Sequence, residues 1–289
     1  MKNTFYIISL SILFFSCGAE KKEKLVASIN VSNKKNNKSK LNKEEDHKKL
    51  LKEAYQYFKE GNDEESIKLA NKVLEHGRAV NDYDLIGGAL SSLCRNAQRT
   101  LDTTKLAELS IELAKLSKTS GKKKWMMKRA HMNAEMWRLI GNLEKAEAFY
   151  NESMRISESI GAMGMFTIDH FNKSFVSTAT GDFAEARRLI TKYYALRKEA
   201  DPTSEDAYGL IALAYILEQE GDFNGAMEVA SVTRRLFKEQ NIFPEPPDEK
   251  PLIGVEKNVL NMLKPDMIKK IKKRSLTQSV NSLLEKYLK

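Results

Sequence analysis

Apolar residues recur at spacings of three and four along most of the chain after residue 43, which is the pattern of amphipathic helices. In the first such stretch, Leu50, Leu51, Ala54 and Tyr57 fall on one face, and the partner helix starts near residue 64. The same pattern predicts further helix pairs at 82–100 and 103–118, 122–140 and 143–159, 163–180 and 183–199, and 204–220 and 223–239. The pattern therefore predicts an all-α protein built from helix pairs.

A short polar turn separates the two helices of each pair, and this turn recurs every forty residues. The turns are Gly61-Asn62-Asp63, Leu101-Asp102-Thr103, Gly141-Asn142-Leu143, Gly181-Asp182-Phe183 and Gly221-Asp222-Phe223. Gly suits a helix break because it accepts a positive φ, and Asn or Asp suits the position that caps the next helix. A fixed period in this range is typical of a solenoid of helical repeats.

Mostly small residues stand at fixed places on both sides of each turn. Those seven residues before it are Ala54, Cys94, Ala134, Ser174 and Ala214, and those five residues after it are Ser66, Leu106, Ala146, Ala186 and Ala226. A small side chain lets two helices approach closely. We therefore expect the two helices of each pair to meet at these positions.

These features resemble the tetratricopeptide repeat (TPR) family over residues 43–241. The matching features are the small residue before the turn, the Gly-Asp/Asn-apolar turn, and Ala146, Ala186 and Ala226 after it. The period is longer than the usual repeat of about 34 residues, the helix-ending proline is missing, and Leu101 and Leu106 replace the expected Gly and Ala. The resemblance implies a right-handed α-solenoid of about five helix-turn-helix repeats, which is a binding architecture with many unrelated ligands.

Two segments follow the repeats. Residues 242–251 hold four prolines and predict a linker, because proline cannot continue a helix. Beyond it, Leu252–Leu263 and Asp266–Leu288 predict two helices within a segment, residues 252–289, that caps the solenoid. The alternative is that these helices dock a partner through the cations Lys269, Lys270, Lys272, Lys273 and Arg274.

The first residues have the layout of a bacterial lipoprotein signal. Lys2 precedes an uncharged apolar run that ends at Phe15, and Ser16 directly precedes Cys17. The run is shorter than the roughly 20 residues of a membrane-spanning helix. We expect cleavage after residue 16 and acylation of Cys17, with an uncleaved anchor or cleavage without lipid as alternatives. Acyl chains on Cys17 would give stable membrane attachment.

The expected anchor sets the expected location. Residues 17–42 contain few large apolar groups and predict a flexible tether, because such a segment buries too little surface to offset its ordering entropy. The protein is then expected in the bacterial cell envelope, anchored to the inner or outer membrane and facing the periplasm or the cell surface.

The charge of the chain does not point to nucleic acid. The formal net charge is +9, but residues 18–42 contribute about +5 and residues 264–289 contribute +6, so the repeats are close to balanced. Basic ends of this kind are typical of solvated or lipid-facing segments. Nucleic acid is therefore not an expected partner.

No catalytic or metal-binding motif stands out. The four histidines are His47, His76, His131 and His170, and none belongs to a metal-binding motif. His131 and His170 lie in adjacent repeats near equivalent helix faces, but the sequence places no acidic or thiol partner beside them at ligand spacing. Cys94 occupies a small-residue packing position, which favours a buried, unreactive thiol. We expect no enzymatic activity, no metal and no cofactor.

In TPR proteins the first helix of each pair lines a concave groove, and the resemblance transfers this role to positions at fixed distances before each turn. The expected groove residues are Tyr55, Arg95, Arg99, His131, Glu135, Arg138, Phe171, Phe175, Tyr208 and Tyr215. The cations of the second and third repeats match carboxylates, and the rings of the fourth and fifth match apolar side chains. The expected partner is a protein or peptide with acidic and hydrophobic residues.

The sequence thus predicts a non-enzymatic, membrane-anchored TPR lipoprotein that holds a protein partner as a scaffold, assembly factor or signalling adaptor. One alternative is a lipoprotein receptor for a small ligand or a glycan. Another is a TPR-type regulator whose basic C-terminal helices are the output.

Overall fold

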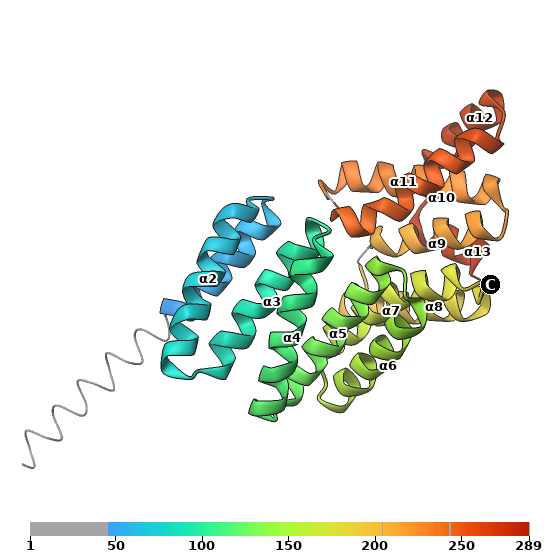
Figure 1. Cartoon of the computed structure of the whole chain (residues 1–289). Coiled ribbons are helices and arrows are strands. Elements are labelled where there is room, and N and C mark those ends of the chain that lie inside the picture. The colour runs from blue at the N-terminus through green and yellow to red at the C-terminus, as the bar shows by residue number, and fades with distance from the viewer. Residues whose placement is uncertain (1–45, 204, 243, 289) are drawn as a thin grey trace, which may run out of the picture. The chain divides into compact units, whose positions relative to one another are not determined.

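The structure, a computed structural model, describes residues 46–203, 205–242 and 244–288 (Figure 1). The expected signal peptide, Cys17 and the tether lie outside the described residues. The chain divides into residues 1–49 and a compact unit of residues 50–289, which holds the helices discussed below. A helix that ends at residue 59 is followed by α2 (Asp63–Val80), α3 (Tyr83–Arg99), α4 (Thr103–Ser120), α5 (Lys123–Ile140), α6 (Leu143–Ser159), α7 (Met163–Ala179), α8 (Phe183–Ala200), α9 (Tyr208–Gln219), α10 (Phe223–Glu239), α11 (Pro246–Met262), α12 (Pro265–Ser275) and α13 (Val280–Tyr287).

The expected all-α repeat fold is confirmed, since the described residues form helices without strands. Each helix from α2 to α10 packs against the next one, as in a TPR-like solenoid. The first helices of successive pairs also touch, α3 with α5, α5 with α7 and α7 with α9. The first helices therefore form the closer-packed face of the array.

The forty-residue repeat consists of two halves of nearly equal length. Positive φ angles occur at residues 61, 81, 101, 121, 141, 161, 181, 221 and 241. The turns between pairs therefore contain a residue in the left-handed conformation, as the turns within pairs do. Leu101 keeps this conformation, with φ 57°, although it lacks the freedom of glycine. The series is interrupted at Asp201, whose backbone is extended, and α9 begins at Tyr208 instead of near residue 204.

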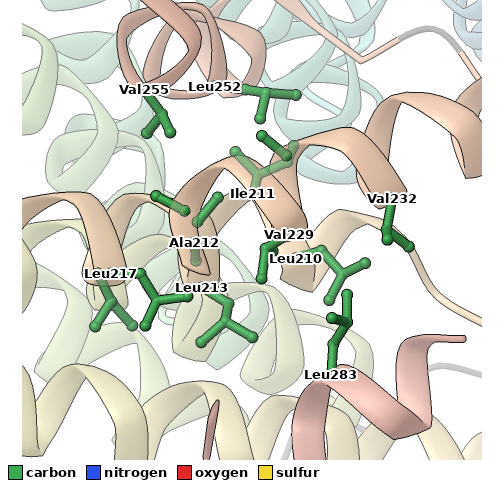
Figure 2. Packing of buried hydrophobic residues seen from close by; sticks show 14 of the residues in the cluster. Leu210, Ile211, Ala212, Leu213, Leu217, Val229, Val232, Leu252, Val255 and Leu283 are labelled. Carbon is green, nitrogen blue, oxygen red and sulfur yellow. The ribbon is translucent and has the colours of Figure 1, made fainter. Parts of the chain in front are cut away.

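The expected contacts at small residues are also confirmed. All ten residues seven before and five after the turns are 0% exposed. The Asn or Asp after each turn caps the following helix through its side chain, as Asn62, Asp102, Asn142, Asp182 and Asp222 do. The largest apolar cluster joins α7 to α13 and includes Leu210, Leu213, Val229, Leu252 and Leu283 (Figure 2).

The segment expected as a proline-rich linker is partly helical. α11 begins at Pro246 and continues through Pro251, so residues 246–251 of the expected linker are helical. Two prolines in the first turn fit a helix start, because their missing N–H groups have no intrahelical partner there. α11 packs on α9 and α10 and also touches α3, so it lies against the repeats instead of leading away from them.

The last segment, Asp266–Leu288, was expected to form one helix and instead contains two. α12 ends at Ser275, and α13 starts at Val280 after a capping box in which Ser279 and Ser282 bond each other's backbone. Both helices pack on α10.

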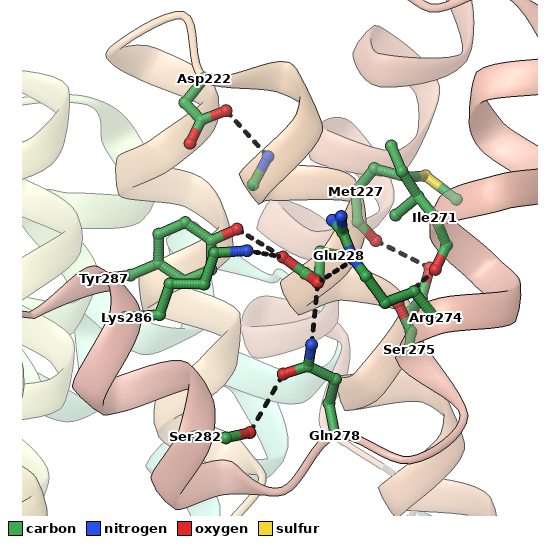
Figure 3. A network of polar contacts seen from close by, with 12 residues as sticks. Asp222, Met227, Glu228, Ile271, Arg274, Ser275, Gln278, Ser282, Lys286 and Tyr287 are labelled. Atoms are coloured by element: carbon green, nitrogen blue, oxygen red, sulfur yellow. Dashed lines mark hydrogen bonds and ion pairs between the residues drawn. The ribbon is translucent and has the colours of Figure 1, made fainter.

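A buried carboxylate holds these two helices to α10. Glu228 is 0% exposed and accepts hydrogen bonds from Arg274 Nε (2.7 Å), Gln278 Nε2 (3.1 Å), Lys286 Nζ (2.6 Å) and the Tyr287 hydroxyl (2.5 Å) (Figure 3). Burial disfavours the charge, but the bonds from Lys286 and Tyr287 outweigh it and lower the pKa of Glu228. The network therefore depends on an ionised Glu228.

Among the described helices, none combines the length and apolar character needed to cross a membrane.

Candidate binding face

The expected groove residues lie on the first helices, which form the closer-packed face of the array. We call this surface the first-helix face. It is defined by Tyr55, Arg95, Arg99, Lys128, His131, Glu135, Arg138, Phe171, Phe175, Tyr208 and Tyr215. All of these come from the helix before α2 and from α3, α5, α7 and α9.

Glu135 is the centre of a buried polar network and is not a free contact residue. Its carboxylate is 0% exposed and accepts hydrogen bonds from Gln98 Nε2 (2.6 Å), Arg138 Nη2 (2.7 Å), Asn172 Nδ2 (2.6 Å) and the Tyr150 hydroxyl. Burial opposes ionisation, but the charge of Arg138 outweighs it, and the pKa of Glu135 is lowered. The network ties α3, α5, α6 and α7 together.

His131 has an acidic partner that the sequence did not reveal. Its Nδ1 lies 2.7 Å from Asp169 Oδ1, and both side chains are buried. His170 turns elsewhere, with Nδ1 2.7 Å from the Phe166 carbonyl oxygen. The structure thus pairs His131 with Asp169 and His170 with a backbone carbonyl, and no group of three metal-ligating side chains forms within the described part of the chain.

The expected hydrophobic zone is an internal aromatic cluster. Phe171 and Phe175 are buried, with ring centroids 5.0 Å apart, and Phe171 also lies 6.4 Å from the ring of Tyr208. Tyr215 packs on Phe175 at 6.1 Å. These rings fill the space between α7 and α9, so Phe171 and Phe175 are core residues in this conformation.

Arg99 and Arg138 are also engaged within the chain. Arg99 bonds Asp63 Oδ1 at 3.1 Å and lies 3.8 Å from Glu245 Oε1, just before α11. Arg138 is held by Glu135 and lies over the ring of Phe175 at 5.7 Å. Both guanidinium groups therefore have acidic partners already.

Arg95 and Lys128 differ from the other cations of this face, because neither forms an ion pair within the described part of the chain. Arg95 lies over the ring of Tyr55 at 5.0 Å, and that ring is 45% exposed. Burial, together with the charge of Arg95, lowers the pKa of Lys128 to about 8, although the charge of Asp169 acts in the opposite direction. Two cations on neighbouring helices thus repel each other beside an exposed ring.

Sequence reasoning missed Lys128, Asp169, Glu245 and Asp248. Lys128 stands thirteen residues before its turn, which is the same place as Tyr208 in the fifth repeat, so the repeat frame contained the signal. Asp169 follows from no spacing rule. Glu245 and Asp248 were assigned to a linker, so nothing placed them against the repeats.

The thiol of Cys94 is buried and unreactive, as expected. Cys94 is buried, and burial raises its pKa to about 12. A thiol with this pKa is almost entirely protonated at neutral pH and is a poor nucleophile.

Comparison with known proteins adds little to this description. No known protein family matches the chain, and no curated protein matches it by sequence. Among solved structures, it is similar to a tetratricopeptide repeat protein from Parabacteroides merdae ATCC 43184, at 14% identity, with a TM-score of 0.32, over 81% of this chain and 100% of that one. The class follows from the helix pairs and their turns, which define an all-α, TPR-like helical-repeat solenoid.

Proposed function

We propose that the protein is a binding scaffold whose first-helix face holds an acidic segment of a partner protein. The observation that carries this proposal is the pair Arg95 and Lys128, two cations that form no ion pair within the described part of the chain, on a face where Arg99 and Arg138 do. Two carboxylates of a partner would remove the repulsion between them. An apolar side chain of the same partner would cover the exposed ring of Tyr55.

A labelled peptide of alternating glutamate pairs and single phenylalanines tests this proposal. We expect it to bind the protein, and we expect Arg95→Gln with Lys128→Gln to weaken binding about tenfold, because each lost charge contact is worth up to about 1 kcal/mol. Fluorescence anisotropy at low and moderate salt measures both dissociation constants.

The matched control removes the same charge elsewhere. Lys115 and Lys118 on α4 are exposed and form no ion pair within the described residues, so Lys115→Gln with Lys118→Gln changes the net charge equally. Equal weakening by both double variants would mean non-specific attraction and would contradict a site at Arg95 and Lys128.

We also propose that Cys17 carries a lipid that holds the scaffold at a membrane of the bacterial cell envelope. The support is the sequence alone, with an apolar run that ends at Ser16-Cys17. We expect the intact mass of the membrane-extracted protein to lack residues 1–16 and to gain acyl mass, and Cys17→Ala to abolish the gain. A full-length mass without lipid would refute the anchor and leave the binding proposal standing.

A further inference from the structure

The first turn of α11 brings acidic groups onto the first-helix face. Glu245 precedes the helix and lies 3.8 Å from Arg99, and Pro247 is buried. Asp248 is close enough for its carboxyl to interact with Arg138 and with Glu135 of α5, and with Tyr208 of α9. This turn therefore spans the face from α3 to α9.

The segment has the chemistry proposed for the partner. Residues 245–249 read Glu-Pro-Pro-Asp-Glu, which offers three carboxylates and two apolar rings within five residues. Its Glu245 pairs with Arg99 and its Asp248 approaches Arg138, whereas neither Arg95 nor Lys128 forms an ion pair with it. The resident segment thus covers part of the face on which an acidic ligand would lie.

We propose that residues 245–249 are a resident ligand of the first-helix face, and that an acidic partner segment binds by displacing them. This inference rests on the proposed function. It adds a regulation of the same site, because the affinity for the partner then reflects the difference in binding free energy between the partner segment and residues 245–249. The first turn of α11 would undock while the rest of the helix stays on α9 and α10.

Asp248 makes the docked segment sensitive to pH. Burial raises its pKa to about 7, although Arg138 acts in the opposite direction. The surrounding charged and titratable groups are Glu135 and Arg138 of α5, Tyr208 of α9, Arg95 and Arg99 of α3, Arg234 of α10, and Glu245 and Glu249 of the segment itself. The docked Asp248 carboxyl stays protonated up to about pH 7, whereas the undocked carboxyl loses its proton at its ordinary pKa. Docking is therefore strongest below the ordinary carboxyl pKa, and it weakens as the pH rises from there to about 7.

The substitution Asp248→Asn separates displacement from simple attraction. It removes the charge that docking has to bury, so we expect the glutamate–phenylalanine peptide to bind about tenfold more weakly than to the wild type at pH 7.5, and by a smaller factor at pH 5.5. Simple electrostatics predicts the reverse, because the variant is one charge more positive. The matched control is Asp266→Asn, because Asp266 is exposed on α12 and forms no ion pair with the described residues.

Hydrogen exchange of the full chain gives the second readout. We expect the peptide to speed amide exchange in residues 246–252 of the wild-type protein and to leave α12 unchanged. Unchanged exchange, with equal affinity of wild type and Asp248→Asn, would overturn displacement even if binding still depended on Arg95 and Lys128. Absence of binding to wild type and to both Asp248→Asn and Asp266→Asn would instead refute the proposed function.

Discussion

Replacing Glu135 with alanine is expected to lower the free energy of unfolding by about 3–5 kcal/mol, because the change leaves a buried charge without its partner. The Arg138 side chain is only 10% exposed and would keep its charge. Gln98, Asn172 and Tyr150 would each lose an acceptor at the same time. Urea unfolding followed by circular dichroism at 222 nm measures the change.

The control for this prediction is Glu144→Ala, because Glu144 is exposed on α6 and forms no ion pair in the described part of the chain. It should stay within about 0.5 kcal/mol of the wild type. A double change of Glu135→Leu and Arg138→Leu should recover part of the loss, since it removes both charges together. If Glu135→Ala cost no more than Glu144→Ala, the network would not be a stabilising element.

The pH dependence of this network has a definite sign. The pKa of Glu135 is lowered in the folded protein, so its contribution is present above the unfolded pKa and is lost as the pH falls through the folded value. The wild-type protein should therefore lose stability in acid more steeply than Glu135→Leu/Arg138→Leu.

Replacing Glu228 with alanine is expected to release α13 and loosen α12 while the repeats stay folded. Four donors would lose one shared acceptor, although Arg274 and Lys286 are about half exposed and water would compensate them in part. We expect a local cost of about 2 kcal/mol, the range of hydrogen bonds to charged groups. Amide exchange in residues 265–288 should accelerate, and exchange in α5 should not.

The control is Glu285→Ala, which should leave exchange unchanged, because Glu285 is exposed on α13 and forms no ion pair among the described residues. Because the pKa of Glu228 is lowered, the wild-type protein should release the same helices in acid, below the ordinary carboxyl range. Loss of the whole fold on Glu228→Ala would contradict a local role.

The repeats could be predicted because their signals are local. Turn residues such as Asn62 and Asp182 act on the helix that directly follows them, and small residues such as Ala54 and Ala214 act on the neighbouring helix at a fixed spacing. The irregular second repeat folds in the same way, because Leu101 adopts the left-handed conformation that glycine adopts at the equivalent position of the other repeats.

The face itself was harder to predict, because its contacts join residues that no spacing relates. His131 contacts Asp169, and Glu135 accepts hydrogen bonds from Gln98 and Asn172. Each of these partners comes from another repeat. The rings Phe171 and Phe175 have the period of groove residues but pack on each other, since apolar side chains on closely packed helices are buried whenever a neighbour reaches them. The start of α11 was predicted as a linker because of its prolines, although proline is well tolerated in the first turn of a helix.

The contact between α11 and α3 also changes how this array can assemble. Repeats of a solenoid ordinarily touch only their neighbours, so they can fold one after another as the chain is synthesised. Here Arg99 meets Glu245, so the early repeats complete their surface only after α11 has left the ribosome. Until then Arg99 would have only Asp63 as its acidic partner, and the finished protein would couple α3 and α11 through a contact that a simple row of repeats does not have.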